Sequence, residues 1–300
     1  MPNLIQCVPN FSEGRRADVV QRIVDAISWA SEVKVVDYSM DVDHNRAVVT
    51  MLGQPEDVRK SIFAGAKEAV ELIDLNTHQG GHPRVGAVDV IPLVPIGETT
   101  MTQAIALSYD IGRDLADNLQ LPVYFYERSA IRPHNTNLAG VRRGGFEALK
   151  LNGLIDSRAP DLGPAEIHPT AGVTVVGARG PLIAFNVNLA SNDMQAARAI
   201  ARKMREVRDS GQALQGVKAI AVLLQSRDIA QISTNITLPH NTSMYEVYSF
   251  VEREAKAMGI EVLESELIGA LREEAVLDCV CSSMKLRGLG HSRILDNYMR

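Results

Sequence analysis

The chain has 300 residues, which exceeds the usual size of a single folding core and predicts either one large α/β unit or two compact subdomains. Hydrophobic residues make up 46% and charged residues 22%, the composition of an ordinary globular protein that forms a sizeable core. The net charge is −5, which disfavours a nucleic-acid-binding protein. An anionic substrate would therefore need local basic groups.

The cysteines and the N-terminus indicate a cytoplasmic protein. Cys7, Cys279 and Cys281 have neither the pairing of a disulfide framework nor the spacing of a zinc site, which fits a reducing compartment. The N-terminus lacks a basic region followed by an apolar stretch, and no apolar run reaches the length of a membrane span. We expect a protein that binds neither nucleic acid nor a membrane.

In the first half of the chain, β-rich and amphipathic stretches alternate. Strands are predicted at residues 4–8, 33–38, 46–52, 85–96 and 122–126. Helices are predicted from a cap at Ser12 to about residue 28, from Pro55 to about residue 73, and over residues 101–119. The next stretch, residues 129–164, is rich in Arg, Gly, Asn and Pro and is predicted to be a linker.

The same order of elements begins again after residue 164. The strands at 173–176 and 182–189 are predicted to form a hairpin around Gly177, Gly180 and Pro181. Further strands are predicted at 217–224, 230–236 and 260–262, and helices at 193–207, 243–258 and 272–284.

This repeated order predicts an α/β (α+β) fold of two subdomains, residues 1–160 and 161–300. Each half shows strand, helix, two strands, helix and strand, or a close variant. Such an order gives a mostly antiparallel sheet with helices packed on one face, the split βαβ or ferredoxin-like arrangement. We expect a ligand cleft between the subdomains.

The densest group of reactive side chains lies in residues 76–89. His78, His82 and Arg84 share this stretch with several glycines, between a predicted helix and a predicted strand. Gly and Pro after a helix are also ordinary stop signals, but a stop signal does not explain two histidines and an arginine. The glycines and Pro83 make a helical zinc-binding pair of histidines unfavourable, so no metal is expected here.

A second group occupies the connection between two predicted strands, residues 37–46. It contains three acids, Asp37, Asp41 and Asp43, followed by His44 and Arg46. Such a connection is common as a solvated hairpin turn. Alternatively, one of the acids orients a histidine of the first group.

Two weaker candidates complete the set. Asn186 and Asn188 alternate with apolar residues, so both amides point to one face of a strand, either towards a heterocycle with donor and acceptor edges or towards solvent. Residues 10–16 predict a helix N-terminus beside Arg15 and Arg16, which is an ordinary setting for anion binding.

Several motifs, in the same order along the chain, resemble the formimidoyltransferase half of formimidoyltransferase-cyclodeaminase. They are Cys7-Val-Pro-Asn-Phe-Ser-Glu-Gly14, His44-Asn-Arg46, His82-Pro-Arg84-x-Gly86-Ala87-x-Asp89, Gly177-Ala-Arg179-x-x-Leu-Ile-Ala-Phe-Asn186-x-Asn188 and Ala230-Gln-x-Ser233-Thr-Asn235. The resemblance implies two α/β subdomains with folate bound between them, and a homo-oligomer. It also implies transfer of a formimino group between N-formimino-L-glutamate and tetrahydrofolate, a co-substrate, with no metal required.

The resemblance also implies roles for particular residues. The family's catalytic histidine falls on His82, which would act as acid and base. The second aspartate of the animal bifunctional form falls on Ser39, so Asp37, Asp41 or Asp43 would have to orient that histidine. The family's folate-contacting segment falls on Gly163, Pro164, Ala165, Glu166, Ile167, His168, Pro169, Thr170, Ala171 and Gly172. Only Gly163, Pro164, Pro169 and Gly172 of that segment match the animal form.

Arginine suits the substrate carboxylates, because a guanidinium pairs with them bidentately. Arg46, Arg84 and Arg179 are the candidates, and Asn186 and Asn188 are candidates for folate or substrate contacts. The cyclodeaminase half has no counterpart in this sequence. Two alternatives stay open: a glutamate formyltransferase that acts on 5-formyl-tetrahydrofolate, and a folate-binding protein without turnover.

Overall fold

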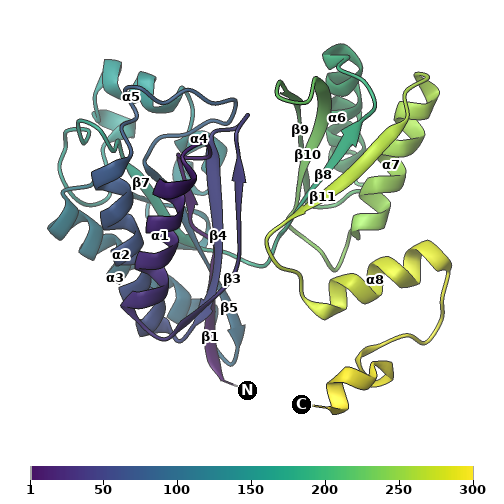
Figure 1. The fold of residues 1–300 in the computed structure, drawn as a ribbon, viewed down its shortest axis with the longest axis horizontal. Coiled ribbons are helices and arrows are strands. Elements are labelled where there is room, and N and C mark those ends of the chain that lie inside the picture. Colours follow the sequence, from purple (N-terminus) through teal and green to yellow (C-terminus); the bar gives the residue numbers. More distant parts are fainter. Residues whose placement is uncertain (1, 300) are drawn as a thin grey trace. The chain divides into compact units, whose positions relative to one another are not determined.

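A computed structural model describes residues 2–299 and divides the chain into two units, Met1–Gly180 and Pro181–Arg300 (Figure 1). The boundary lies later in the chain than the predicted one between residues 160 and 161. Strand β7 (Thr174–Ala178) explains the difference, because it pairs with two strands of the first unit. Residues 163–172, which we expected in the second subdomain, therefore belong to the first unit.

The first unit has a seven-stranded sheet with three long helices on one face (Figure 1). Its other strands are β1 (Asn3–Cys7), β2 (Asn10–Phe11), β3 (Val33–Asp41), β4 (Arg46–Gly53), β5 (Val88–Gly97) and β6 (Val123–Phe125). The long helices are α1 (Ala17–Ala30), α2 (Pro55–Leu72) and α3 (Met101–Leu119). Most strand pairs are antiparallel, as predicted, but β7 runs parallel to both β5 and β6.

Strand β7 does not form the predicted hairpin with the strand that follows it. That strand, β8 (Ile183–Leu189), pairs with β10 (Ile229–Ile236) and β11 (Val262–Ile268) of the second unit. Gly177, which suggested a turn, instead allows a close approach within the first sheet. A Cβ atom there would lie 2.3 Å from the carbonyl oxygen of Tyr126.

The apolar faces of α1, α2 and α3 form the main core of the first unit. Val20 and Ile23 of α1, at helical spacing, are buried against the sheet. Full burial of such a side chain contributes roughly 1.5–3 kcal/mol. Residues at the N-termini favour the start of two of these helices. Helix α2 has Pro55 in its first turn, and α3 has a capping box formed by Thr100 and Gln103.

Residues 129–164 pack on the opposite face of this sheet, so their prediction as a linker is wrong. They include two short helices and several single turns, and Val141 and Leu149 are buried together with Tyr124. Gly144 and Gly153 flank the second of these helices, and both have a positive φ. The helices are α4 (Leu138–Val141) and α5 (Gly145–Asn152).

The second unit has the predicted split βαβ order. Its elements are β8, α6 (Met194–Asp209), β9 (Val217–Leu224), β10, α7 (Met244–Ala257), β11 and α8 (Glu273–Met284). The strands lie in the order β11-β8-β10-β9, and every pair is antiparallel. Ile200 of α6 and Val247 of α7 are buried in one core with the sheet, which confirms the predicted architecture.

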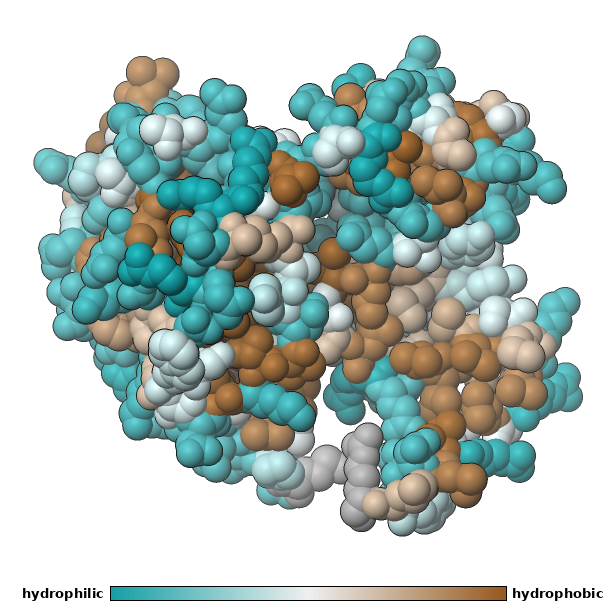
Figure 2. All heavy atoms as spheres, in the orientation of Figure 1, coloured by the Kyte–Doolittle hydropathy of each residue, from teal (hydrophilic) through white to brown (hydrophobic). Residues whose placement is uncertain are grey.

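Helix α8 differs from the other long helices because none of its residues is buried. Val276, Met284 and Leu286 are exposed, and so is Leu295 further along the chain. Figure 2 shows hydrophobic residues gathered over α8 and the segment that follows it. None of the helices formed by residues 2–299, α8 included, is long and apolar enough to cross a membrane.

We expect residues 1–180 to fold on their own and residues 1–160 to fail. The shorter fragment lacks β7, and with it the strand between β5 and β6 and the buried side chains of Val175 and Val176. Folded domains are stable by only about 5–15 kcal/mol, so the loss of a strand that pairs on both sides should prevent residues 1–160 from folding. Thermal unfolding of both fragments, followed by circular dichroism, tests this. A cooperative transition of residues 1–160 at the midpoint of the longer fragment would contradict the assignment.

Candidate active site

The connection from α2 to β5, residues 73–87, lies directly against the turn between β3 and β4. The Gly81 amide donates a hydrogen bond to the carbonyl oxygen of Asp43, at 3.0 Å. A Cβ atom at Gly80 would lie 2.2 Å from the carbonyl oxygen of His44, so only glycine fits there. Helix α2 already ends at Leu72, so these glycines do not stop a helix. They allow two loops to touch.

Asn45 fixes these loops through three hydrogen bonds. Its side-chain oxygen accepts from the Gly14 amide at 2.9 Å, and its side-chain nitrogen donates to the Gln79 carbonyl at 3.0 Å. Its own carbonyl oxygen lies 2.8 Å from Nε2 of His78. Asn45 is buried and has a positive φ of 47°, which asparagine tolerates better than most residues.

His82 lies in this loop with both ring nitrogens engaged. Nε2 is 2.6 Å from Nη1 of Arg46, and Nδ1 is 2.7 Å from the carbonyl oxygen of Pro83. A guanidinium only donates hydrogen bonds, so Nε2 is the acceptor and Nδ1 carries the proton. The His82 ring also packs edge-on against that of His44, with 5.8 Å between the ring centroids.

The surroundings of His82 keep its ring neutral. Burial, together with the positive charges of Arg46 and Arg142, lowers the pKa of His82 from its ordinary 6.5 to about 2. Burial and repulsion by Arg142 lower the pKa of Arg46 to about 10, so Arg46 keeps its charge near neutral pH. The site therefore combines a neutral imidazole with two cationic groups.

Arg142 was not predicted from the sequence, because it lies in residues 129–164, which were predicted to be a linker. It follows α4 and makes an ion pair with Asp89, whose other carboxylate oxygen accepts from the Val85 amide at 2.8 Å. Nε of Arg142 and Nε of Arg46 are both buried, and neither has a hydrogen-bond partner among the described residues. Two guanidinium groups with spare donors are suited to a substrate carboxylate.

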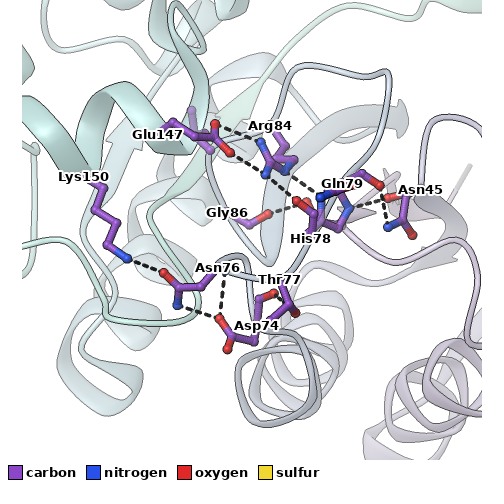
Figure 3. Close-up of polar contacts among 12 residues, drawn as sticks. Asn45, Asp74, Asn76, Thr77, His78, Gln79, Arg84, Gly86, Glu147 and Lys150 are labelled. Carbon is purple, nitrogen blue, oxygen red and sulfur yellow. Dashed lines mark hydrogen bonds and ion pairs between the residues drawn. The ribbon is translucent and has the colours of Figure 1, made fainter.

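Arg84 has protein partners on both sides of its guanidinium. Nη2 and Nη1 lie 2.7 Å and 3.1 Å from the two carboxylate oxygens of Glu147 (Figure 3). Nε donates to Nδ1 of His78 at 2.7 Å, and burial lowers the pKa of that histidine. Arg84 thus ties the loop to α5, and a substrate carboxylate would have to displace Glu147 to reach it.

Residues 163–172 are joined to the His82 loop by backbone hydrogen bonds. The Ala87 amide donates to the Ala171 carbonyl at 2.8 Å, and the Val173 amide donates to the Val85 carbonyl at 3.0 Å. A Cβ atom at Gly86 would lie 1.8 Å from the carbonyl oxygen of Val173, so this pairing requires glycine. The structure therefore brings together the predicted folate segment and the predicted catalytic loop.

The other predicted residues of this segment surround a tight turn. The ring of His168 folds back, and its Nδ1 accepts a hydrogen bond from the Ala171 amide at 3.0 Å. The amide of Leu75 donates to the Thr170 carbonyl at 2.9 Å, and Nδ2 of Asn76 donates to the Pro169 carbonyl at 2.9 Å. These contacts connect the segment to the start of the His82 loop as well.

The two asparagines of β8 lie in the second unit, and both are buried, which rules out the alternative that they face solvent. Nδ2 of Asn186 is 3.1 Å from Glu266, and Nδ2 of Asn188 is 3.1 Å from Glu264. Sequence reasoning missed Gln231, whose Nε2 donates to Oδ1 of Asn188 at 3.0 Å. Its position in the shared motif Ala230-Gln-x-Ser233 was the available signal.

Two further predictions concern single residues near the ends of the first unit. Arg179 follows β7, and its Nη1 donates to the carbonyl oxygen of Gly180 at 2.9 Å. Ser12 does not cap α1: its hydroxyl donates to the Gly86 carbonyl at 2.7 Å. The start of α1 is held by Glu13, which accepts from the amides of Arg15 and Arg16 at 2.9 Å each. The anion site predicted there is thus filled by the protein's own carboxylate.

Of the three acids that could orient a histidine, Asp41 contacts one. Its Oδ2 lies 3.1 Å from Nδ1 of His44, not of His82. Burial raises the pKa of Asp41, but hydrogen bonds from His44 and the positive charge that ring can carry outweigh burial, and the net pKa is lowered. Within residues 2–299, no three or more His, Cys, Asp or Glu side chains are grouped to hold a metal ion.

Comparison with known proteins gives the same family for both units. Residues 4–179 match the N-terminal subdomain of the formiminotransferase domain, and residues 184–286 match the formiminotransferase domain. The chain is 39% identical over 300 residues to glutamate formimidoyltransferase of Streptococcus pyogenes serotype M1, across 100% of this chain and 99% of that protein. It is 40% identical over 299 residues to glutamate formimidoyltransferase of Thermoplasma acidophilum, across 99% and 97%. Formimidoyltransferase-cyclodeaminase of Rattus norvegicus is 38% identical over 292 residues, across 95% of this chain and 54% of that protein.

We expect Arg46→Met to raise the pKa of His82 from about 2. Burial would still favour the neutral ring, but loss of a neighbouring like charge should raise the pKa by roughly 1–3 pH units. Arg46→Lys keeps the charge and serves as the matched control. Titration of the imidazole C–H resonances by NMR measures the pKa in each protein. An unchanged pKa in Arg46→Met would show that burial alone keeps His82 neutral.

Proposed function

Because the chain belongs to the formiminotransferase family, we propose that it transfers a formimino group between N-formimino-L-glutamate and tetrahydrofolate. The observation that carries the proposal is a neutral imidazole, His82, beside the guanidinium groups of Arg46 and Arg142. An anionic amino acid as donor needs cationic groups, and exchange between two nitrogens needs a neutral proton acceptor.

The reaction moves one proton and exchanges one carbon–nitrogen bond. N5 of tetrahydrofolate attacks the formimino carbon and forms a tetrahedral intermediate. The intermediate collapses when the bond from that carbon to the glutamate nitrogen breaks, and the electron pair stays on that nitrogen. N5 loses a proton, and the glutamate nitrogen gains one. We assign both proton transfers to His82. General acid–base catalysis of this kind typically contributes about 10²–10⁴-fold to the rate.

Substrate binding would also activate His82. A carboxylate of formiminoglutamate that pairs with Arg46 would neutralise the charge next to the ring and draw Nη1 away from Nε2, which is now 2.6 Å away. The pKa of His82 would then rise, because one of the causes of its low value would be removed. Arg142 is a better second carboxylate partner than Arg84, because Nε of Arg142 has no hydrogen-bond partner among the described residues, whereas Nε, Nη1 and Nη2 of Arg84 all have partners.

Tetrahydrofolate is the co-substrate in this proposal, and residues 163–172 are its proposed contacts. The attachment of this segment to the His82 loop supports the assignment, because it would bring the pteridine and the imidazole together. In the second unit, Asn186 and Asn188 stay predicted contacts. Their amides have the donor and acceptor groups that a heterocycle edge requires, and a bound heterocycle would have to displace or share their present contacts with Glu264, Glu266 and Gln231. The predicted cleft between the subdomains stays a prediction as well.

This activity would place the chain in histidine degradation and one-carbon metabolism in the cytoplasm. Formyl transfer from 5-formyl-tetrahydrofolate is the second candidate, because a formyl group differs from a formimino group only by oxygen in place of NH. A folate-binding protein without turnover is the third. The neutral His82 beside two arginines favours catalysis over simple binding.

We expect purified protein to turn over formiminoglutamate with tetrahydrofolate, and His82→Ala to reduce kcat by about 10²-fold or more. Folate affinity and the unfolding midpoint should change little, because His82 lies in a loop. Initial rates, folate titration and circular dichroism measure these quantities. His240→Ala, at an exposed histidine of the second unit, is the matched control. Faster turnover with the formyl donor would select the second candidate, and a wild-type rate in His82→Ala would remove His82 from the mechanism.

A homo-oligomer is the assembly that we propose, and the exposed apolar residues of α8 support it. Val276→Glu and Met284→Glu would place charges in that surface and should weaken self-association. Light scattering coupled to size-exclusion chromatography measures the mass. Trp29→Glu, at an exposed apolar residue of α1, is the control. A wild-type protein of monomer mass would contradict the proposal.

A further inference from the structure

The turn between β3 and β4 holds a second histidine, His44, that the proposed reaction has not used. His44 is only 5% exposed. Oδ1 of Asp41 accepts hydrogen bonds from the amides of Asp43 and His44, at 2.9 Å and 2.7 Å, which folds the turn. Oδ2 of the same carboxylate lies 3.1 Å from Nδ1 of His44. One aspartate therefore fixes both the backbone and the ring of His44.

This arrangement determines which ring nitrogen is free. A carboxylate accepts hydrogen bonds, so Nδ1 of His44 carries a proton towards Asp41. The other nitrogen, Nε2, is buried and has no hydrogen-bond partner in the described part of the chain. A histidine that served only to hold the turn would have no use for a buried acceptor without a partner, because such an atom destabilises the fold.

The free edge of the His44 ring lies on the side of the His82 loop. The rings of His44 and His82 meet edge-on, with 5.8 Å between their centroids and 64° between their planes. A Cβ atom at Gly81 would be 3.8 Å from Cδ2 of His44, the ring atom bonded to Nε2. The unused nitrogen thus lies beside the site that contains His82 and Arg46.

The two histidines differ in the charges that support them. His44 has a carboxylate behind Nδ1, which stabilises a ring that takes up a proton at Nε2. His82 has the guanidinium of Arg46 at Nε2, which opposes such a proton. The proposed reaction must store the proton that N5 loses until the glutamate nitrogen takes it. Of the two rings, His44 is better placed to hold this proton, because the carboxylate of Asp41 lies at its Nδ1.

We propose that His44 is a second proton-transfer residue of this site and that Asp41 is its positioning residue. The inference rests on the proposed formimino transfer. As N5 bonds to the formimino carbon, its proton passes to Nε2 of His82 and from there to Nε2 of His44, which stores it. When the bond to the glutamate nitrogen breaks, the glutamate nitrogen keeps the electron pair and takes the proton back through His82. Both rings end the cycle neutral.

The first test is His44→Gln in the full-length protein. We expect kcat with formiminoglutamate and tetrahydrofolate to fall by about 10²-fold or more, whereas KM for both substrates should stay within a few-fold. His291→Gln is the control, because His291 also pairs with a carboxylate, Glu273, but is exposed. A wild-type kcat in His44→Gln overturns the inference. Absence of turnover in the wild-type protein overturns the proposed function instead.

The second test, Asp41→Asn, separates proton transfer from folding of the turn. The amide keeps one oxygen for the backbone of the turn and places an NH2 group against Nδ1 of His44. The ring should then switch to the form with its proton on Nε2, which the ¹⁵N chemical shifts of the imidazole report. We expect a similar fall in kcat with an unchanged unfolding midpoint, and no further loss in the double variant with His44→Gln. A tautomer switch without a fall in kcat would overturn the inference, even if His44→Gln had failed to fold.

Discussion

The buried side chain of Asn45 joins three loops of the first unit. The backbone near Gly14, the turn that contains Asn45 and the loop through Gln79 converge on its amide group. Asn45 stands between His44 and Arg46 in the sequence, so its conformation sets the direction of both side chains. The positive φ at this position is part of the same constraint, since most other residues would be strained there. The geometry of the site thus depends on one residue without an acid or base group.

The electrostatics of the site are unfavourable in the absence of an anion, and they connect the site to stability. The pKa of His82 is below its ordinary value, so below about pH 6.5 the unfolded chain binds a proton that the folded chain does not. Stability is therefore lost as the pH falls below that value. The lowered pKa values of Asp41 and Glu13 act in the same direction at more acidic pH. The arrangement lowers the stability of the fold at acid pH and keeps His82 neutral near neutral pH.

The sequence predicted the elements better than their pairing. The strands and helices of the second unit follow from apolar periodicity, and the repeated order gave the split βαβ fold. The pairing of β7 with β5 and β6 could not be predicted, because the sequence of a short buried strand does not identify its partner strands. Gly177 also suggested a turn at this point. The histidine loop was recognised from its unusual composition. Arg142 was missed because a lone arginine in a Gly-rich segment has no local signal, and it reaches Asp89 only through the tertiary fold.

The partner of the site's aspartate also depends on the tertiary fold and could not be predicted from the sequence. The sequence offered three aspartates for one histidine, and only the geometry of the turn shows that Asp41 reaches His44. Asp41 pairs with His44, and Asp89 pairs with Arg142. The guanidinium of Arg46 instead contacts the neutral ring of His82. The net charge of the chain is negative, so no global field attracts an anion to this place. The positive potential is local, produced by burying two guanidinium groups against fewer carboxylates than they could pair with. In the proposed reaction, an anionic substrate that binds there would supply a negative charge, and the chemistry proposed for the two histidines would begin from that neutralised state.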